Sequence, residues 1–600
     1  MKKKWNLVSV LAVIALITLS SCTAPTQTPV ALPSVQPTAT AWEEPTETPA
    51  ATEAASEFSS VVEYNLGETK IVQKNFPEDS TFREMPLLLN GLIAVPAGEG
   101  GPFPLVVVLH GNHPGCPLDS SDVDRWPCDR EVEQPNYRGF DYLLQTLADN
   151  GYVALSMNIN AENTLGFGEP IAGERLGQIF DQHMQALAKA ASGGENLFGV
   201  DLNGRVDLSR IVLVGHSRGG EESVRLAREL NDEKTESVNL PYGPISGLVL
   251  LASAVTAVNP DGGIPVPTAI ILPVCDGDVI SQDGQHFFEA ARLAPQQTER
   301  IISVWLEQAN HNFFNRNLGP DPFWLQDRPD CSSILEPGEQ QQFLTAFIPD
   351  FLATLFSQDA EVANAASERL GLNIQSPVIE ELYGFSARVA LLTPAEDRVT
   401  IMIPAAETEL STNLQGGAVT EVGVTTHFCP AGFYTPEMLP GSEACRRATV
   451  TIPGQPALAY VTWQQPGGEW QFTLPQGAGD ISGFTTITVR AALDPLSDLN
   501  APGEFQAFSL QLTDSFGKIA ILKTKTDEPA LVFPPGNAVE DDFFGSHFTG
   551  IVPMTDIRFK LEDFSGIDLT NITQVIILFD QTQSGALYIA DLGWVRPTQP

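Results

Sequence analysis

The most restrictive feature of this 600-residue chain is a short strand that runs directly into a glycine-flanked serine and then into a helix. The segment 211–214 is an apolar run too short for a helix, so we interpret it as a buried strand. Gly215-His216-Ser217-Arg218-Gly219 follows at once, and the pattern becomes helical from Glu221. In so sharp a turn only glycine fits beside the serine, whose hydroxyl is then presented at the apex. The alternative is a glycine turn whose serine merely caps the helix.

Two later strands lead to side chains that could activate this serine. The apolar run 267–272 precedes a pair of aspartates, and the apolar run 301–306 precedes His311. A serine hydroxyl is a poor nucleophile unless an imidazole accepts its proton, and the imidazole needs a carboxylate to fix its tautomer. We therefore assign Ser217 as the nucleophile and His311 as the general base. The alternative for His311 is a polar loop residue without a catalytic role.

The carboxylate partner is Asp276 or Asp278. The position after the strand favours Asp276, to which we lean, whereas the helix that begins near Gln282 favours Asp278. Asp-Gly-Asp also resembles the start of a calcium-binding loop, which requires glycine at its sixth place and glutamate at its twelfth. Ser281 and Phe287 stand there instead, and no Cys/His cluster indicates zinc, so we expect no metal site.

Acyl transfer through a serine also needs donors for the oxyanion. The backbone N–H of Arg218, directly after the serine, is the first candidate. The apolar run 104–109 predicts an earlier strand, and the loop after it, His110-Gly111-Asn112, supplies the N–H of Asn112 as the second candidate.

These residues resemble the α/β-hydrolase superfamily, in which the order in the chain is serine, acid, histidine. The similarity is to secreted bacterial serine esterases, cutinase-like polyester hydrolases and platelet-activating-factor acetylhydrolases. Gly215 to Gly220 also resembles the same turn in plant chlorophyllases. The resemblance covers about half of the chain, and it implies the fold and the triad far more firmly than any substrate.

The catalytic domain is expected over residues 61–358. Residues 61–97 predict an antiparallel edge of a larger sheet, and strands then alternate with helices. This alternation indicates a mostly parallel sheet covered on both faces, with the site at the carboxyl ends of the strands. Residues 113–139 and 160–173 are candidate walls of a substrate pocket. The aromatic side chains after the histidine could line a pocket or belong to the core: Phe313, Phe314, Phe323 and Trp324.

The N-terminus predicts export. Three lysines precede the apolar run 7–19, which is too short for a stable membrane span. Leu19-Ser20-Ser21-Cys22 resembles a bacterial lipobox, so residues 1–22 are expected to be a lipoprotein signal with Cys22 lipidated. An ordinary cleaved signal is the alternative. Residues 23–60, rich in proline, threonine and alanine, predict a solvated tether.

Besides Cys22, the chain contains six cysteines, an even number that implies disulfides in an exported protein. Six cysteines allow 15 connectivities. Proximity in the sequence suggests three pairs: Cys116–Cys128, Cys275–Cys331 and Cys429–Cys445.

Residues 359–377 lose periodicity and are predicted to be a linker, followed by a β-sandwich over 378–600. Short alternating runs separated by Gly and Pro predict its strands, with 448–452 among them. The segment 585–594 resembles the last strand of galactose-binding-like jelly rolls. That resemblance implies a carbohydrate or surface ligand, with a purely structural domain as the alternative.

Together these observations predict an exported, membrane-anchored lipoprotein facing the periplasm or the extracellular space. It is expected to be a serine hydrolase that cleaves small or polymeric carboxylic esters without a cofactor. The net charge of −41 argues against nucleic-acid binding, and membrane contact is expected through the lipid alone. The alternatives are a non-catalytic surface binding protein on the same scaffold, or a peptidase or acyltransferase with the same triad.

Overall fold

A computed structural model describes residues 59–597, except for 117–125, 129–132, 165, 169, 172, 233–239, 295–296, 324, 326–327, 433–442 and 542–544. The predicted signal, Cys22 and nearly all of the predicted tether therefore lie outside the described residues. Within the described part of the chain, no helix combines the length and apolar character needed to cross a bilayer.

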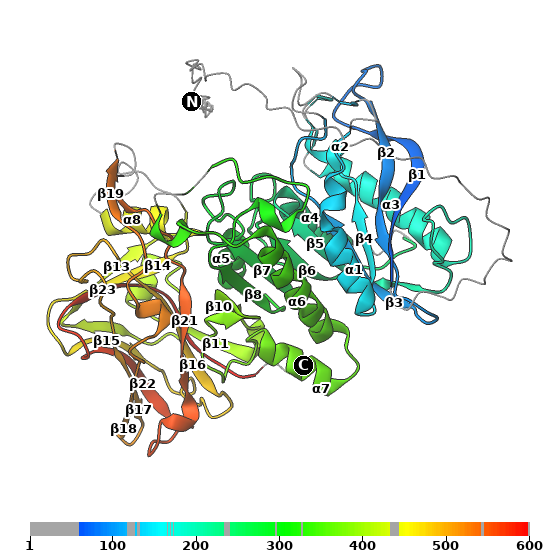
Figure 1. The fold of residues 1–600 in the computed structure, drawn as a ribbon. Helices are drawn as coiled ribbons and strands as arrows, with labels where there is room; N and C mark the ends of the chain where they lie inside the picture. The colour runs from blue at the N-terminus through cyan, green and yellow to red at the C-terminus, as the bar shows by residue number, and fades with distance from the viewer. Residues whose placement is uncertain are drawn as a thin grey trace, which may run out of the picture. The chain divides into compact units, whose positions relative to one another are not determined.

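Residues 61–392 build a ten-stranded sheet in the order β1-β2-β4-β3-β5-β6-β7-β8-β10-β9 (Figure 1). β3 to β8 run parallel, whereas β1, β2, β9 and β10 pair antiparallel at the two edges. The strands are β1 (Val61–Val72), β2 (Glu84–Ala94), β3 (Phe103–Leu109), β4 (Val153–Met157), β5 (Val206–His216), β6 (Ile245–Leu251), β7 (Thr268–Pro273), β8 (Ile301–Leu306), β9 (Glu381–Leu382) and β10 (Phe385–Leu392).

Helices cover both faces of this sheet, as the alternation of elements predicts. Alternate residues of a strand point to opposite faces, so Val107 of β3 packs in one core and Val106 in the other. The first core includes residues of α3, α4 and α5, and the second includes residues of α1 and α6. The helices are α1 (Asp141–Asp149), α2 (Asn160–Asn163), α3 (Glu174–Ala191), α4 (Arg218–Leu230), α5 (Gln285–Leu293), α6 (Pro337–Phe356) and α7 (Ala360–Arg369).

The domain boundary differs from the expected one. The segment predicted to be a linker, 359–377, contains the helix α7, capped by the Asp359 side chain. Beyond residue 377, β9 and β10 extend the first sheet, because Ala387 to Leu392 pair with Leu306 to Ile301 of β8. The sandwich therefore begins after β10 and not at residue 378. Residues 385–389 alternate in polarity as a strand of either sheet would, so the sequence could not show that the partner of this strand is β8.

Residues 398–595 fold as two larger antiparallel sheets around an apolar core, with β19 and β20 as a separate two-stranded sheet. One sheet has the order β13-β14-β23-β16-β21 with β11 also paired to β23, and the other has the order β12-β15-β22-β17-β18. The strands are β11 (Arg398–Met402), β12 (Val419–Val422), β13 (Val424–Cys429), β14 (Leu458–Trp463), β15 (Gly468–Thr473), β16 (Thr486–Leu493), β17 (Ser509–Asp514), β18 (Ile519–Lys523), β19 (Ala538–Asp541), β20 (Gly545–Phe548), β21 (Thr555–Lys560), β22 (Ile572–Phe579) and β23 (Gly585–Val595).

One predicted strand of this domain is a helix. Residues 448–452 alternate in polarity, but they lie within and just after α8 (Glu443–Thr451). Cys445, Ala448 and Thr449 are buried at the i, i+3 and i+4 spacing of a helix face. Cys445 is joined to Cys429, so a covalent contact holds this helix against β13.

The three disulfides join the pairs that proximity in the sequence suggests: Cys116–Cys128, Cys275–Cys331 and Cys429–Cys445. Such bonds are typical of proteins that fold in an oxidising compartment.

Candidate active site

The predicted strand, turn and helix around Ser217 are present in the structure. β5 ends at His216, and α4 begins at Arg218. Ser217 has φ 56° and ψ −123°, a conformation that costs a non-glycine residue on the order of 1–3 kcal/mol. Two hydrogen bonds hold the turn, because the Ser217 N–H donates to the carbonyl of Leu251 (2.9 Å) and its carbonyl accepts from Gly220 N–H (2.9 Å).

The glycines of the turn are required by close approach of the backbone. A Cβ on Gly215 would lie 2.2 Å from the carbonyl oxygen of Gly219. A Cβ on Gly219 would lie 2.5 Å from the carbonyl oxygen of Leu109, at the end of β3. Any side chain at either position would force the helix away from the strands, so these residues fix the turn against the loop after β3.

A buried acid–imidazole pair lies at the ends of β7 and β8. The Nδ1 of His311 lies 2.9 Å from Oδ2 of Asp276, and both side chains are almost fully buried. The other oxygen of Asp276 accepts from the N–H groups of Asp278 (2.9 Å) and Val279 (2.7 Å), which orients the carboxylate. Asp278 is exposed and lies on the other side of the ring, 3.8 Å from Nε2.

This environment favours a charged imidazole. Burial opposes the charged form, but the charge of Asp276 and its hydrogen bond outweigh that effect and raise the pKa of His311 above its ordinary value of 6.5. The Nε2 of His311 is buried and has no hydrogen-bond partner among the described residues. The Nε2 of His311 is therefore free to take up a proton.

The backbone of the histidine loop is tied to the serine turn. The Nε2–H of His216, the residue before the serine, donates to the carbonyl of His311 (3.0 Å). Burial lowers the pKa of His216 well below 6.5, so the ring is neutral and can donate from this nitrogen alone. His216 therefore acts as a brace between β5 and the loop after β8.

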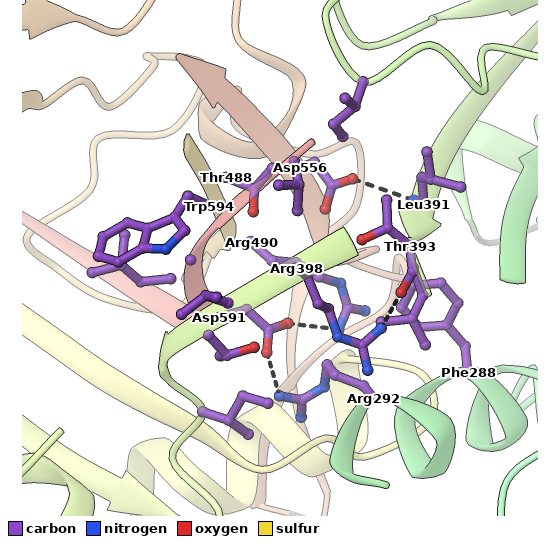
Figure 2. A pocket seen from close by; sticks show the side chains of 18 residues that line it. Phe288, Arg292, Leu391, Thr393, Arg398, Thr488, Arg490, Asp556, Asp591 and Trp594 are labelled. Carbon is purple, nitrogen blue, oxygen red and sulfur yellow. Dashed lines mark hydrogen bonds and ion pairs between the residues drawn. The ribbon is translucent and has the colours of Figure 1, made fainter. Parts of the chain in front are cut away.

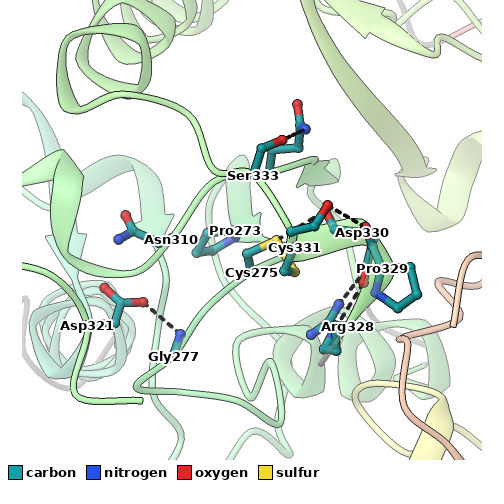
Figure 3. Close-up of a disulfide and its surroundings, with 12 residues drawn as sticks. Pro273, Cys275, Gly277, Asn310, Asp321, Arg328, Pro329, Asp330, Cys331 and Ser333 are labelled. Atoms are coloured by element: carbon teal, nitrogen blue, oxygen red, sulfur yellow. Dashed lines mark hydrogen bonds and ion pairs between the residues drawn. A yellow bond between two sulfur atoms is a disulfide. The ribbon is translucent and has the colours of Figure 1, made fainter. Parts of the chain in front are cut away.

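Asp321 ties the acid loop to the histidine loop, and the sequence pattern did not indicate it. Its carboxylate accepts from the N–H groups of Gly277 (2.7 Å), His311 (2.9 Å) and Asn312 (2.9 Å). Figure 3 shows this carboxylate beside Gly277, near the disulfide Cys275–Cys331. Asp321 follows an irregular Gly-Pro segment, so no periodicity could have found it.

The loop that follows β3 lies against the serine. A Cβ built on Gly111 would lie 2.7 Å from the Cβ of Ser217 and 2.9 Å from Nε2 of His113. The neighbouring backbone N–H of Asn112 was the predicted second oxyanion donor. Arg218, the predicted first donor, is the first residue of α4, where an N–H has no acceptor within the helix.

His113 is a further residue of this site that sequence reasoning placed only in a loop. Its Nε2 is buried without a hydrogen-bond partner among the described residues. Burial, together with the neighbouring His110 and His311, lowers the pKa of His113 to about 3, so the ring is neutral at pH 7. The loop therefore presents an unpaired, uncharged imidazole nitrogen near the nucleophile.

The Arg218 side chain has a structural partner. Its Nε lies 3.4 Å from the buried carboxylate of Glu221. Glu221 also accepts from the N–H groups of Thr256 (2.7 Å) and Ala257 (2.7 Å), so it anchors α4 to the segment after β6. This arrangement favours a bracing role for the guanidinium over recognition of an anionic substrate.

The aromatic residues after His311 divide between core and surface. Phe314 is fully buried in the core that includes α1 and α6, so it is not free to line a pocket. Phe323 is 60% exposed, Phe313 is half-buried, and Trp324 lies outside the described residues. No group of three or more His, Cys, Asp or Glu side chains within the described ranges is arranged to hold a metal ion.

Solved structures similar to this chain include hydrolases and carbohydrate-binding modules. No family model and no curated protein matches the chain. A dienelactone-hydrolase-like promiscuous phosphotriesterase from metagenomic libraries is 14% identical, with 50% of this chain and 100% of that chain covered (TM-score 0.25). Esterase 2 of Thermogutta terrifontis with propionate bound is 16% identical, with 49% and 97% covered (TM-score 0.28).

A family 11 carbohydrate-binding module of Clostridium thermocellum in complex with a mixed-linked tetrasaccharide is also similar to part of the chain. It is 11% identical, with 34% of this chain and 97% of that chain covered (TM-score 0.20). At such identities and TM-scores, these similarities do not by themselves assign an activity.

Proposed function

We propose that the protein is a serine hydrolase of carboxylic esters that works through an acyl-enzyme, with Ser217, His311 and Asp276 as its triad. The observation that carries the proposal is the buried Asp276–His311 pair, 2.9 Å apart, beside a strained serine turn at the carboxyl ends of the sheet. Asp276 is preferred to Asp278 because it contacts Nδ1, which leaves Nε2 for the serine proton.

In the proposed reaction, Nε2 of His311 takes the proton of Ser217 as Oγ attacks the ester carbonyl carbon. Asp276 stabilises the imidazolium that results. When the tetrahedral intermediate collapses, the bond to the leaving oxygen breaks and His311 returns the proton to the departing alcohol. Water then attacks the acyl-serine with His311 again as the base, which releases the carboxylic acid and restores the hydroxyl.

The oxyanion of the intermediate needs preorganised donors. The N–H groups of Arg218 and Asn112 are the proposed backbone donors, and the Nε2–H tautomer of His113 is a proposed third donor. A neutral ring suits this role, because it can donate without bringing a full positive charge beside His311.

Fluorophosphonate labelling combined with hydrolysis of p-nitrophenyl esters tests the activity. Label is expected on Ser217, and both labelling and turnover are expected to disappear in Ser217→Ala. A wild-type protein that neither reacts with the probe nor cleaves esters of any acyl length would favour the alternative of a surface binding protein. Faster cleavage of peptide amides, or acyl transfer to added acceptors, would favour the peptidase or acyltransferase alternative.

The sandwich is proposed to dock the enzyme to a polymer, a glycan or a cell surface. Trp594 and Tyr588 of β23 are buried, so the segment that resembles a jelly-roll strand builds the core and cannot stack on a sugar. The outer face of the second sheet is the candidate surface, where Gln471, Gln511 and the exposed Ile521 lie in register with the buried Ile576 across four strands. Weaker retention on insoluble glycan or polyester by Gln511→Ala than by wild type would support this role.

The proposal includes export and lipidation at Cys22. Metabolic labelling with a fatty acid, lost in Cys22→Ala, tests the anchor without affecting the assignment of the triad.

A further inference from the structure

A cavity lies away from the candidate active site, where the sandwich strands β11, β16 and β23 meet the end of β10 and the helix α5. Figure 2 shows the charged side chains that surround it. The volume of the cavity is about 60 Å³, whereas a single water needs about 10–15 Å³. The cavity is therefore large enough for several waters or for one small ion.

Most charged side chains around the cavity are paired. Arg292 contacts Glu289 (3.0 Å) and Asp591 (2.9 Å), and Arg490 contacts Glu289 (2.9 Å). Asp556 lies 3.7 Å from a guanidinium nitrogen of Arg558. These groups account for three arginines and three carboxylates.

Arg398 also lines the cavity, and it differs from these arginines because it has no ion pair among the described residues. Its guanidinium donates to the carbonyl of Thr393, and no carboxylate of the described residues lies within 4.0 Å of it (Figure 2). Burial lowers the pKa of Arg398, against the weaker favourable effect of Asp591. A partly buried charge without an ion-pair partner is costly, so an anion in the cavity would stabilise this arrangement.

Two further donors of the cavity lining are unsatisfied. The hydroxyl of Thr393 and the Nε–H of Arg490 are buried without a hydrogen-bond partner among the described residues, and each residue is only 3% exposed. Water could accept from these groups, but it could not compensate the charge of Arg398. Unpaired N–H and O–H donors around an excess cation are the arrangement expected for an oxyanion.

We propose that this cavity binds a small oxyanion, a carboxylate or inorganic phosphate, through Arg398, Thr393 and Arg490. The site is independent of the proposed esterase activity, although a carboxylic acid is also the product that such an activity would release. Because Thr393 directly follows β10 of the first sheet, whereas Arg398 and Arg490 belong to the sandwich strands β11 and β16, a bound anion would strengthen the contact between the two domains.

The test is anion binding by the purified full chain at constant ionic strength, with acetate and phosphate as the probes and chloride as the balancing salt. Titrations followed by calorimetry and by thermal unfolding are expected to saturate for at least one probe. Arg398→Gln is expected to weaken that binding roughly tenfold or more, because a charge-assisted hydrogen bond is lost. Saturation by acetate alone indicates a carboxylate site, and saturation by phosphate alone indicates a phosphate site.

Arg388→Gln is the matched control, since Arg388 is paired with Glu307 (3.2 Å) and does not line the cavity. It is expected to bind the anion as the wild type does. Without anion, Arg398→Gln is expected to unfold at a temperature no lower than that of the wild type, because the variant removes an unpaired charge.

The proposal is overturned if neither probe gives saturable binding to the wild type, or if Arg398→Gln binds equally well. Should Arg398→Gln fail to fold, Thr393→Val provides the second variant. This change removes only a hydroxyl that has no partner in the structure, and several-fold weaker binding is expected. Unchanged binding in a folded Thr393→Val protein would contradict the assignment of Thr393 as a ligand.

Discussion

At the scale of single residues, the site depends on which form each imidazole takes. Histidines 110, 113 and 216 are buried without a carboxylate partner among the residues that the structure describes, and burial lowers the pKa of each ring. His311 differs because Asp276 contacts its Nδ1, and its pKa is raised instead. Nearby carboxylates, Asp276 first and then Asp278 and Asp321, thus distinguish the proposed base from three neighbouring rings that stay neutral.

Asp276→Asn is expected to reduce kcat by about 10,000-fold, because the asparagine amide favours the wrong tautomer of His311. The pH profile provides a second readout. His311 must be neutral to accept a proton, so kcat/KM of the wild type should fall as the pH drops through the raised pKa of His311, above 6.5. In the variant this acid limb should move to lower pH. Asp278→Asn is the control, and a larger loss there than in Asp276→Asn would contradict the assignment.

His113 can be tested through the position of its Nε2. His113→Leu is expected to lower kcat about 100-fold, as loss of one oxyanion donor does, with little change in KM. His113→Gln, whose amide nitrogen can occupy the place of Nε2, should recover much of the loss. Affinity for a transition-state analogue such as a boronic acid should fall in parallel with kcat/KM. Equal kcat in all three proteins would exclude His113 from the reaction.

At the scale of elements, the sequence predicted strands correctly where an apolar run was strong. The runs at 153–157 and 301–306 form strands, and the aspartate and histidine after two such strands meet because parallel strands end at one edge of the sheet. Short or interrupted sequence patterns did not predict the correct element or contact. Within the helix α8, residues 448–451 alternate in polarity as the residues of a strand would. Asp321 contacts the acid and histidine loops only through the tertiary structure.

The disulfide Cys275–Cys331 provides a test at this scale, because it joins the acid loop to a segment 56 residues later. Replacing both cysteines by serine should lower the free energy of unfolding by about 4 kcal/mol and also lower kcat, since Asp276 loses its covalent neighbour. The pair Cys429–Cys445, 16 residues apart and in the sandwich, is the matched control. Its loss should cost about 3 kcal/mol and leave kcat unchanged. Equal effects on kcat would show that the first bond does not position the acid.

At the scale of the whole molecule, the two domains share a buried ionic contact. Glu289 of α5 lies between Arg292 of the same helix and Arg490 of β16, and all three side chains are at least 95% buried. The guanidinium of Arg292 also donates to the carbonyls of Ala457 (2.9 Å) and Ala590 (3.1 Å). The domain that carries the ten-stranded sheet and the sandwich are therefore expected to unfold in one transition, although their cores are separate.

Breaking this contact should uncouple the domains. Glu289→Gln leaves the buried guanidinium of Arg490 without its nearest counter-charge and Arg292 with Asp591 alone, which typically costs about 3–5 kcal/mol, whereas replacing both Glu289 and Arg490 by methionine should cost much less. Calorimetry should show one transition for the wild type and two for Glu289→Gln.

Acid should also uncouple the two domains, and the pKa of Glu289 sets the pH range in which this happens. Burial raises the pKa of Glu289, but Arg490 and Arg292 outweigh it and lower the pKa to about 2, against 4.5 in an unfolded chain. The stabilisation is present above pH 4.5 and is lost as the pH falls toward 2. A single transition that persists at pH 2 with an unchanged free energy of unfolding would show that this contact does not hold the domains together.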